Sequence, residues 1–192
     1  MIVLIIGLIV LLGTHSIRIV ADDWRTRQVA RLGLRTYKNI YSVVAVVGFV
    51  LIVWGYGLAR LDPVVLWTPP VWTRHVAALL TFPAFILLAA ASPKGNFLKA
   101  AVGHPMVLGV KVWAFAHLLA NGMLADVVLF GAFLVWSIAD FAAARRRDRR
   151  EGTVHPRGTS ARNLGTLIAG TAVWVVFAFW LHAWLIGVAP FG

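Results

Sequence analysis

Six apolar segments, each close to the length needed to cross a lipid bilayer, constrain this chain more than any other feature of its sequence. They run approximately over Ile2–Val20, Ile40–Leu61, Thr73–Ala91, His104–Gly122, Leu124–Ala143 and Leu164–Gly187. A helix needs roughly 20 apolar residues to cross a hydrocarbon core. Because lipid offers no partner to a free backbone N–H or C=O, such segments form helices. The sequence therefore predicts an all-α bundle of six transmembrane helices, with residues 1–192 as a single domain.

The composition agrees with a protein that lies almost entirely in the membrane. Hydrophobic residues make up 60% of the chain, against roughly 45–50% in soluble domains. This leaves no room for a separate soluble domain. The sequence contains no cysteine, which excludes disulfides, thiolate metal sites and thiol catalysis. The first segment has no basic region before it and no small-residue cleavage site after it, so we expect a retained helix and not a signal peptide.

Basic residues are concentrated in alternate connections between the segments, and they predict the orientation of the chain. The first, third and fifth connections are rich in arginine and lysine, whereas the even connections hold only Arg60 and Arg74. Cytoplasmic loops carry the excess of basic residues, so we expect the odd connections in the cytoplasm and both termini on the outer, periplasmic side. The net charge of +11 then indicates contact with anionic lipid head groups and not with nucleic acid.

The fourth segment, His104–Gly122, is an apolar helix with polar residues inside it. Pro105 suits the first turn, and Asn121-Gly122 predicts an end in the left-handed conformation. About 16 residues, or ~24 Å, lie between these two signals. Lys111 and His117 fall within that length, and polar groups at such depth usually mark a functional interior.

Histidines occur at two depths of the predicted bundle and are the candidate metal ligands. Neutral imidazole is the commonest side-chain metal ligand. A buried pair without cysteine suits haem iron better than hydrolytic zinc, which usually takes three ligands. Side chains lean toward the N-terminus of their helix, so His15 and His117 converge on antiparallel helices and form the first candidate pair. His104 with His15, and His75 with His117, are the alternative pairs.

The other polar residues of the segments have simpler interpretations. Lys111 is a candidate to neutralise a haem propionate or to pair with Asp140, or else it extends toward the cytoplasmic head groups. Asn121 is a candidate polar residue of the pocket. Asp126 follows a helix start, where a carboxylate suits the helix dipole. His182, near a helix end, is expected to be interfacial.

Several motifs resemble those of the NnrU family of bacterial membrane proteins over nearly the whole chain. They are His15-Ser16, Trp54-Gly55-Tyr56, Trp67-Thr68-Pro69-Pro70, and the block from His104-Pro105 to Asn121-Gly122. The resemblance implies a protein of the bacterial inner membrane, associated with denitrification and with nitrite or nitric oxide reductase components as partners. It also implies haem b, because the plant relative, 15-cis-zeta-carotene isomerase, is a haem b protein whose ligand histidines correspond to His15 and His117.

The function expected first is a redox or nitric-oxide-linked sensor, a haem handler or a reductase maturation factor. A haem-dependent isomerase acting on a carotenoid-like polyene is the alternative that the plant relative implies. The His-Pro-x-x-x-Gly start of the fourth segment also resembles small membrane methyltransferases of the isoprenylcysteine carboxyl methyltransferase type. A non-catalytic scaffold for a reductase complex, with its histidines bound to backbone carbonyls, is a further alternative.

Overall fold

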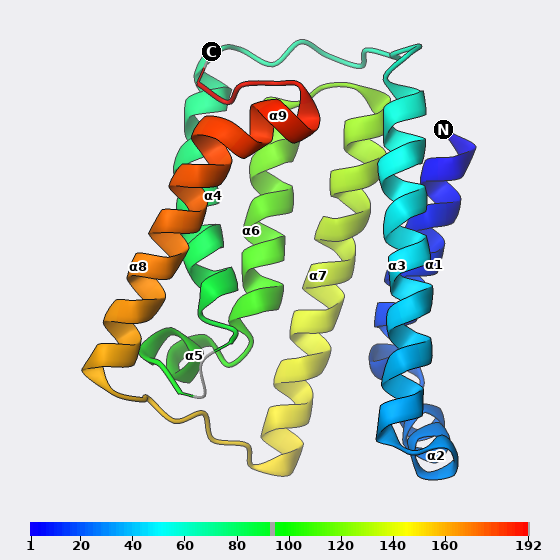
Figure 1. Ribbon diagram of the computed structural model, residues 1–192, viewed down its shortest axis with the longest axis vertical. Coiled ribbons are helices and arrows are strands. Elements are labelled where there is room, and N and C mark those ends of the chain that lie inside the picture. The colour runs from blue at the N-terminus through cyan, green and yellow to red at the C-terminus, as the bar shows by residue number, and fades with distance from the viewer. Residues whose placement is uncertain (93–94, 192) are drawn as a thin grey trace.

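The structure, a computed structural model that describes residues 1–92 and 95–191, is a bundle of helices (Figure 1). In chain order its elements are α1 (Ile2–Val20), α2 (Asp22–Leu32), α3 (Leu34–Ala59), α4 (Trp72–Ala89), α5 (Phe97–Val102), α6 (Pro105–Ala120), α7 (Leu124–Glu151), α8 (Ser160–Val176), the π-helical turn η1 (Phe177–Leu181) and α9 (His182–Ile186). No strand forms in the described part of the chain, where an isolated bridge joins Val65 to Met123. The predicted all-α class is confirmed.

Five helical stretches are long and apolar enough to cross a membrane: α1, α3, α4, α7 and the continuous segment Ser160–Ile186. These stretches make the chain a multi-pass membrane protein. The remaining expected span, α6, is apolar but only 16 residues long. Its rise of about 24 Å is shorter than a hydrocarbon core of roughly 30 Å. Five spans are therefore supported by length, and the sixth stays a prediction.

The predicted helix boundaries hold best where the sequence changes abruptly from apolar to polar. The first segment, Ile2–Val20, is found as predicted. By contrast, α3 begins at Leu34 instead of Ile40, and α7 continues through its arginine run to Glu151 instead of ending near Ala143. Arginine and alanine are good helix formers. A charged run can therefore end the apolar part of a helix without ending the helix itself.

The short helix α2 lies in a region that was expected to be a loop. Asp22 and Asp23 occupy its first turn and Arg31 its last turn, the charge order that the helix dipole favours. It buries no residue in the bundle, and Trp24 is 45% exposed. A short helix with arginines and an exposed tryptophan at the end of a bundle is typical of a helix that lies in the head-group region.

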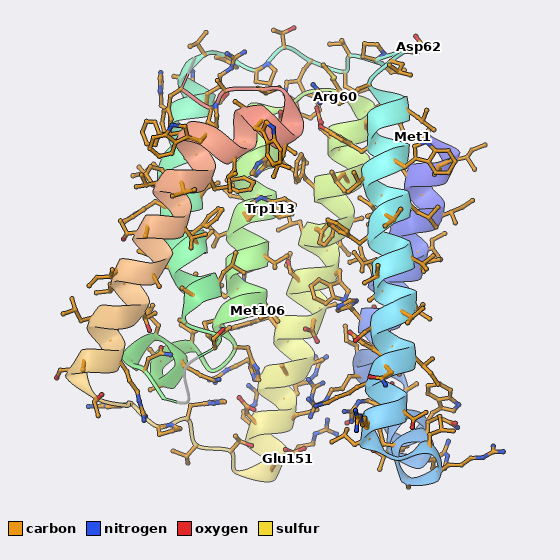
Figure 2. The ribbon with its side chains drawn as sticks, in the orientation of Figure 1. Met1, Arg60, Asp62, Met106, Trp113 and Glu151 are labelled. Atoms are coloured by element: carbon orange, nitrogen blue, oxygen red, sulfur yellow. The ribbon has the colours of Figure 1, made fainter. Side chains whose placement is uncertain are left out.

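The long helices form a curved row in the order α3, α1, α7, α6, α4 and α8 (Figure 1). Both ends of the chain lie at the same end of the bundle, where the connection between α3 and α4 crosses over the other helices. Figure 2 places Met1, Arg60 and Asp62 at this end and Glu151 at the opposite, arginine-rich end. The two ends of the bundle are called the termini end and the basic end below.

The core is small and lies where α1, α3 and α7 meet. Leu4, Leu8, Ile52, Leu129 and Phe130 are buried there. Two glycines let α1 and α3 approach closely. A Cβ at Gly7 would lie 2.6 Å from the Ile52 nitrogen, and one at Gly48 would lie 2.7 Å from the Leu11 nitrogen. Small residues at such contacts are usual in membrane bundles, whose outer apolar side chains face lipid.

The end of α6 differs from the prediction. Asn121 is extended, with φ −129° and ψ 136°, and Gly122 does not have a positive φ, so the expected left-handed end is wrong. The backbone N–H of Leu66 instead donates to the Gly122 carbonyl at 2.8 Å. A Cβ at Gly122 would collide with the Trp67 carbonyl oxygen. This glycine therefore serves close contact with the connection between α3 and α4.

Candidate functional site

His117 lies one turn before the end of α6 and four residues after Trp113, which Figure 2 labels on the same helix. Its ring Nδ1 donates a 2.9 Å hydrogen bond to the Trp113 carbonyl. Phe130 of α7 stacks on the imidazole with ring centroids 4.6 Å apart. In a neutral imidazole whose Nδ1–H is bound to a carbonyl, Nε2 carries the lone pair, which is the arrangement found around metal-bound histidines.

His182 follows the π-helical turn η1 and is the first residue of α9. Its Nδ1 donates to the Val188 carbonyl at 2.6 Å, so Nε2 carries the lone pair when this imidazole is neutral. Its ring centroid lies 6.5 Å from that of His117, with the ring planes 25° apart. The ring of Phe177, in η1, stands edge-on to His182 at 5.8 Å. π-helical turns inside α-helices are frequent at functional sites.

This pairing was missed by the sequence analysis, which expected His182 to be interfacial. The chain turns back after α9 at Gly187, which has a φ of +77°, and this turn brings the Val188 carbonyl to the imidazole. In the sequence, Gly187 followed by Pro190 is the pattern that could have predicted this turn. Nothing in the sequence marks the π-helical turn that precedes the histidine.

His15 lies on α1 and has the same local hydrogen bond, from its Nδ1 to the Leu11 carbonyl at 2.8 Å. Its ring lies 5.2 Å from that of Tyr41 and 5.9 Å from that of Trp136, centroid to centroid. The indole Nε1 of Trp136 is buried and has no hydrogen-bond partner within the described residues. An unpaired buried donor is uncommon and costs free energy.

The structure does not place the rings of His15 and His117 in contact. They touch Trp136 and Phe130 respectively, which are six residues apart on α7, or about 9 Å along its axis. Two imidazole nitrogens bound to one metal at about 2 Å each lie no more than about 4 Å apart. The histidine ring that does lie next to His117 in this structure is that of His182.

The other expected site residues are spread over the bundle. The Asn121 side-chain amide donates to the His117 carbonyl at 2.8 Å, so it lies next to the histidine pair. The Lys111 ammonium lies 5.0 Å from the centre of the Phe141 ring. His75 is exposed on the first turn of α4. His104 precedes α6 near the basic end, and its Nε2 lies 2.9 Å from Oδ2 of Asp148.

Fold and site together define the class: a helical, multi-pass membrane protein with two neighbouring histidines, on α6 and α9, whose Nδ1 atoms are each bonded to a backbone carbonyl. The chain matches the family model described as NnrU protein over residues 3–190, and it therefore belongs to the NnrU family. A comparison with curated proteins and a comparison with solved structures each gave no match.

Proposed function

We propose that this chain is an integral membrane haem b protein of NnrU type, associated with nitrogen-oxide respiration as a redox or nitric-oxide-linked sensor, haem handler or reductase maturation factor. The observation that carries the proposal is the pair of His117 and His182, with ring centroids 6.5 Å apart and planes 25° apart. Each Nδ1 is bound to a backbone carbonyl, so each Nε2 is available to a metal.

The donor set and its surroundings fit haem better than a hydrolytic metal. Two neutral imidazoles are suitable axial ligands, whereas catalytic zinc takes three protein ligands. Trp113 and Phe130 pack against His117, and Phe177 stands edge-on to His182; apolar side chains beside a metal centre tune its access to water. Bound haem would supply electron transfer and an iron that binds nitric oxide. The carbonyls of Trp113 and Val188 hold the two imidazoles in one tautomer and orientation.

The proposal includes an orientation and a location. The arginines of α7 gather at the basic end, opposite both chain termini (Figures 1 and 2). The excess of basic residues in cytoplasmic loops supports placing this end in the cytoplasm of a bacterium, with the termini in the periplasm. Anionic lipid head groups are then the partners of the basic end. Nitrite or nitric oxide reductase components are the proposed protein partners.

The test is the absorption spectrum of the purified protein after haem supplementation, for wild type and single variants. We expect a Soret band in wild type, and its loss or clear shift in His117→Ala and in His182→Ala. His75→Ala, which removes an exposed histidine, is the matched control and should keep the wild-type spectrum. Absence of a Soret band in wild type would contradict haem binding. A spectrum changed by His15→Ala but not by His182→Ala would assign the second ligand to His15, the partner expected from the sequence.

The isomerase alternative uses the same haem and is distinguished by its substrate. It draws support from the aromatic rings beside the pair, since a long polyene binds in apolar, aromatic pockets. Conversion of 9,15,9′-cis-zeta-carotene in a carotenoid-producing host, lost in His117→Ala, is the expected result for an isomerase. Unchanged carotenoid in a host that produces the wild-type protein would reject this alternative.

A further inference from the structure

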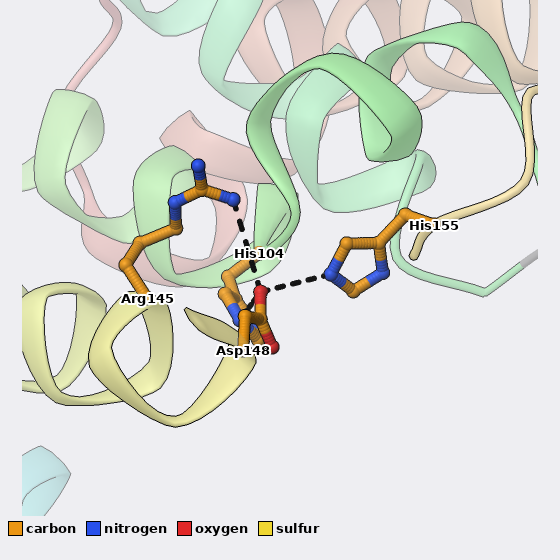
Figure 3. Close-up of polar contacts among 4 residues, drawn as sticks. All are labelled: His104, Arg145, Asp148 and His155. Atoms are coloured by element: carbon orange, nitrogen blue, oxygen red, sulfur yellow. Dashed lines mark hydrogen bonds and ion pairs between the residues drawn. The ribbon is translucent and has the colours of Figure 1, made fainter. Parts of the chain in front are cut away.

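A second histidine cluster lies at the basic end of the bundle, at the opposite end of α6 from His117. Its members come from three segments: His104 just before α6, Asp148 in the last turn of α7, and His155 in the connection that follows α7. Figure 3 shows the two imidazoles and the Arg145 guanidinium directed at the same carboxylate. His104, Asp148 and His155 are called the basic-end cluster below.

The three possible ligand atoms of the cluster converge on one point. Nε2 of His104 and Nε2 of His155 each lie 2.9 Å from the same oxygen, Oδ2 of Asp148. All three atoms lie within 4.8 Å of one another. Ligands of a tetrahedral ion with bonds of about 2.0–2.1 Å are separated by about 3.3 Å. To bind an ion, the two histidine–carboxylate separations of 2.9 Å would lengthen by about 0.4 Å. The two imidazole nitrogens, which lie within 4.8 Å of each other, would adjust to about 3.3 Å.

Gly103 keeps the space beside these ligand atoms free of a side chain. A Cβ at this position would lie 3.2 Å from Asp148 Oδ2 and 3.2 Å from His155 Nε2. The glycine also has a φ of +76°, which other residues rarely adopt. The chain therefore turns sharply here, and the space beside Asp148 and His155 is left to the Arg145 guanidinium, whose Nη1 would lie 2.9 Å from such a Cβ.

The cluster is shielded but within reach of an ion from the aqueous side. The side chains of His104, Asp148 and His155 are 26%, 12% and 16% exposed. Arg145 competes with a cation, because its Nη1 lies 3.8 Å from Asp148 Oδ2. Its side chain is 41% exposed, so the guanidinium can turn toward solvent when an ion takes its place.

We propose that His104, Asp148 and His155 bind a divalent transition-metal ion of the zinc type. Two imidazoles and one carboxylate supply three protein ligands and leave a fourth position of a tetrahedral ion for water or an anion. The ion joins the start of α6, the end of α7 and the connection between α7 and α8. It is separate from the haem site in both position and ligand set.

The test is titration of the full-length protein in detergent, carrying no histidine tag, with zinc chloride by calorimetry. We expect one ion per chain in wild type and a loss of affinity of at least about 100-fold in His155→Gln and in Asp148→Asn. His155 lies in a connection, so its variant keeps the helices intact should Asp148→Asn fail to fold. His75→Gln is the matched control and should bind zinc like wild type.

Further variants test the roles of Arg145 and Gly103 and whether the zinc site is independent of His117 and His182. Arg145→Gln should bind zinc more tightly than wild type, because a competing positive charge is removed. Gly103→Ala should bind more weakly, whereas Gly131→Ala, where a Cβ meets open space, should not. A double variant His117→Ala/His182→Ala should keep the zinc site. Wild-type protein that binds no zinc, or His155→Gln with wild-type affinity, would overturn the proposal.

Discussion

The hydroxyl of Tyr56 on α3 donates a 2.6 Å hydrogen bond to Oδ1 of Asp126 on α7. The other carboxylate oxygen, Oδ2, accepts the backbone N–H of Met123 at 3.1 Å. Asp126 is 3% exposed and belongs to the first turn of α7. One carboxylate therefore completes the start of α7 and also joins it to α3.

Removing the Tyr56 hydroxyl should destabilise the bundle. In Tyr56→Phe the buried Oδ1 loses its donor, and an unsatisfied buried acceptor costs about 1–3 kcal/mol. Thermal unfolding in detergent should show a lower midpoint for this variant. Tyr37→Phe, at the start of α3, removes a hydroxyl without touching Asp126 and is the control. Equal midpoints for the two variants would contradict a stabilising role of the bond.

A methyl group at Gly122 should disturb the connection between α3 and α4. The new Cβ would collide with the Trp67 carbonyl oxygen, so the connection must shift. Overpacking of this kind costs about 1–3 kcal/mol. We expect Gly122→Ala to lower the unfolding midpoint and to make residues 60–71 more sensitive to protease. Gly131→Ala, where a Cβ meets open space, should change neither property. If residues 60–71 of Gly122→Ala resisted protease as well as those of wild type, close packing of Gly122 against Trp67 would be refuted.

Most of the helices could be predicted from the sequence because long apolar segments form helices in a membrane. α1 was predicted with its observed bounds, and Pro105 was correctly placed at the start of α6. The helix α2 was missed because its mean polarity is that of a loop. Its helical nature depends on the spacing of its apolar residues and on the charges at its ends.

The sites were harder to predict because they depend on contacts between distant segments. His117 was identified from its depth in an apolar helix, but its neighbour His182 is brought there by a π-helical turn and a backbone reversal at Gly187. His155 was not among the candidate residues, and in the structure it meets Asp148, seven residues earlier in the chain. The partners of polar residues near helix ends can therefore be named only once the fold is known.

Trp174 and Trp136, both partly buried, should respond differently to loss of the indole N–H. Trp174 Nε1 donates to Thr81 Oγ1 at 3.2 Å and so joins α8 to α4. Trp136 Nε1 is buried without a partner in the described part of the chain. Hydrogen bonds between membrane helices contribute about 0.6 kcal/mol on average. We expect Trp174→Phe to lower the unfolding midpoint in detergent by more than Trp136→Phe does. The reverse order would show that Trp136 has a partner in the folded protein.

The C-terminal helix should depend on a single arginine from a distant part of the chain. Arg60, at the end of α3, donates from Nη1 to the Ile186 carbonyl at 2.7 Å, and its guanidinium carbon lies 5.9 Å from the centre of the Tyr56 ring. The last carbonyls of a helix have no partner within the helix, so a cation that binds one stabilises that end. Arg60 therefore holds α9, and with it His182, against the termini end of the bundle.

Arg60→Ala should loosen α9 without unfolding the bundle. We expect faster amide hydrogen exchange over residues 182–187 and, in the haem-loaded protein, a spectrum that changes in the same direction as that of His182→Ala. Arg74→Ala, which removes an exposed arginine of the first turn of α4 at the same end of the bundle, is the matched control and should leave exchange in α9 unchanged. Wild-type exchange in Arg60→Ala would show that packing alone holds α9. Equal acceleration in both variants would instead assign the effect to the charge of the whole end of the bundle.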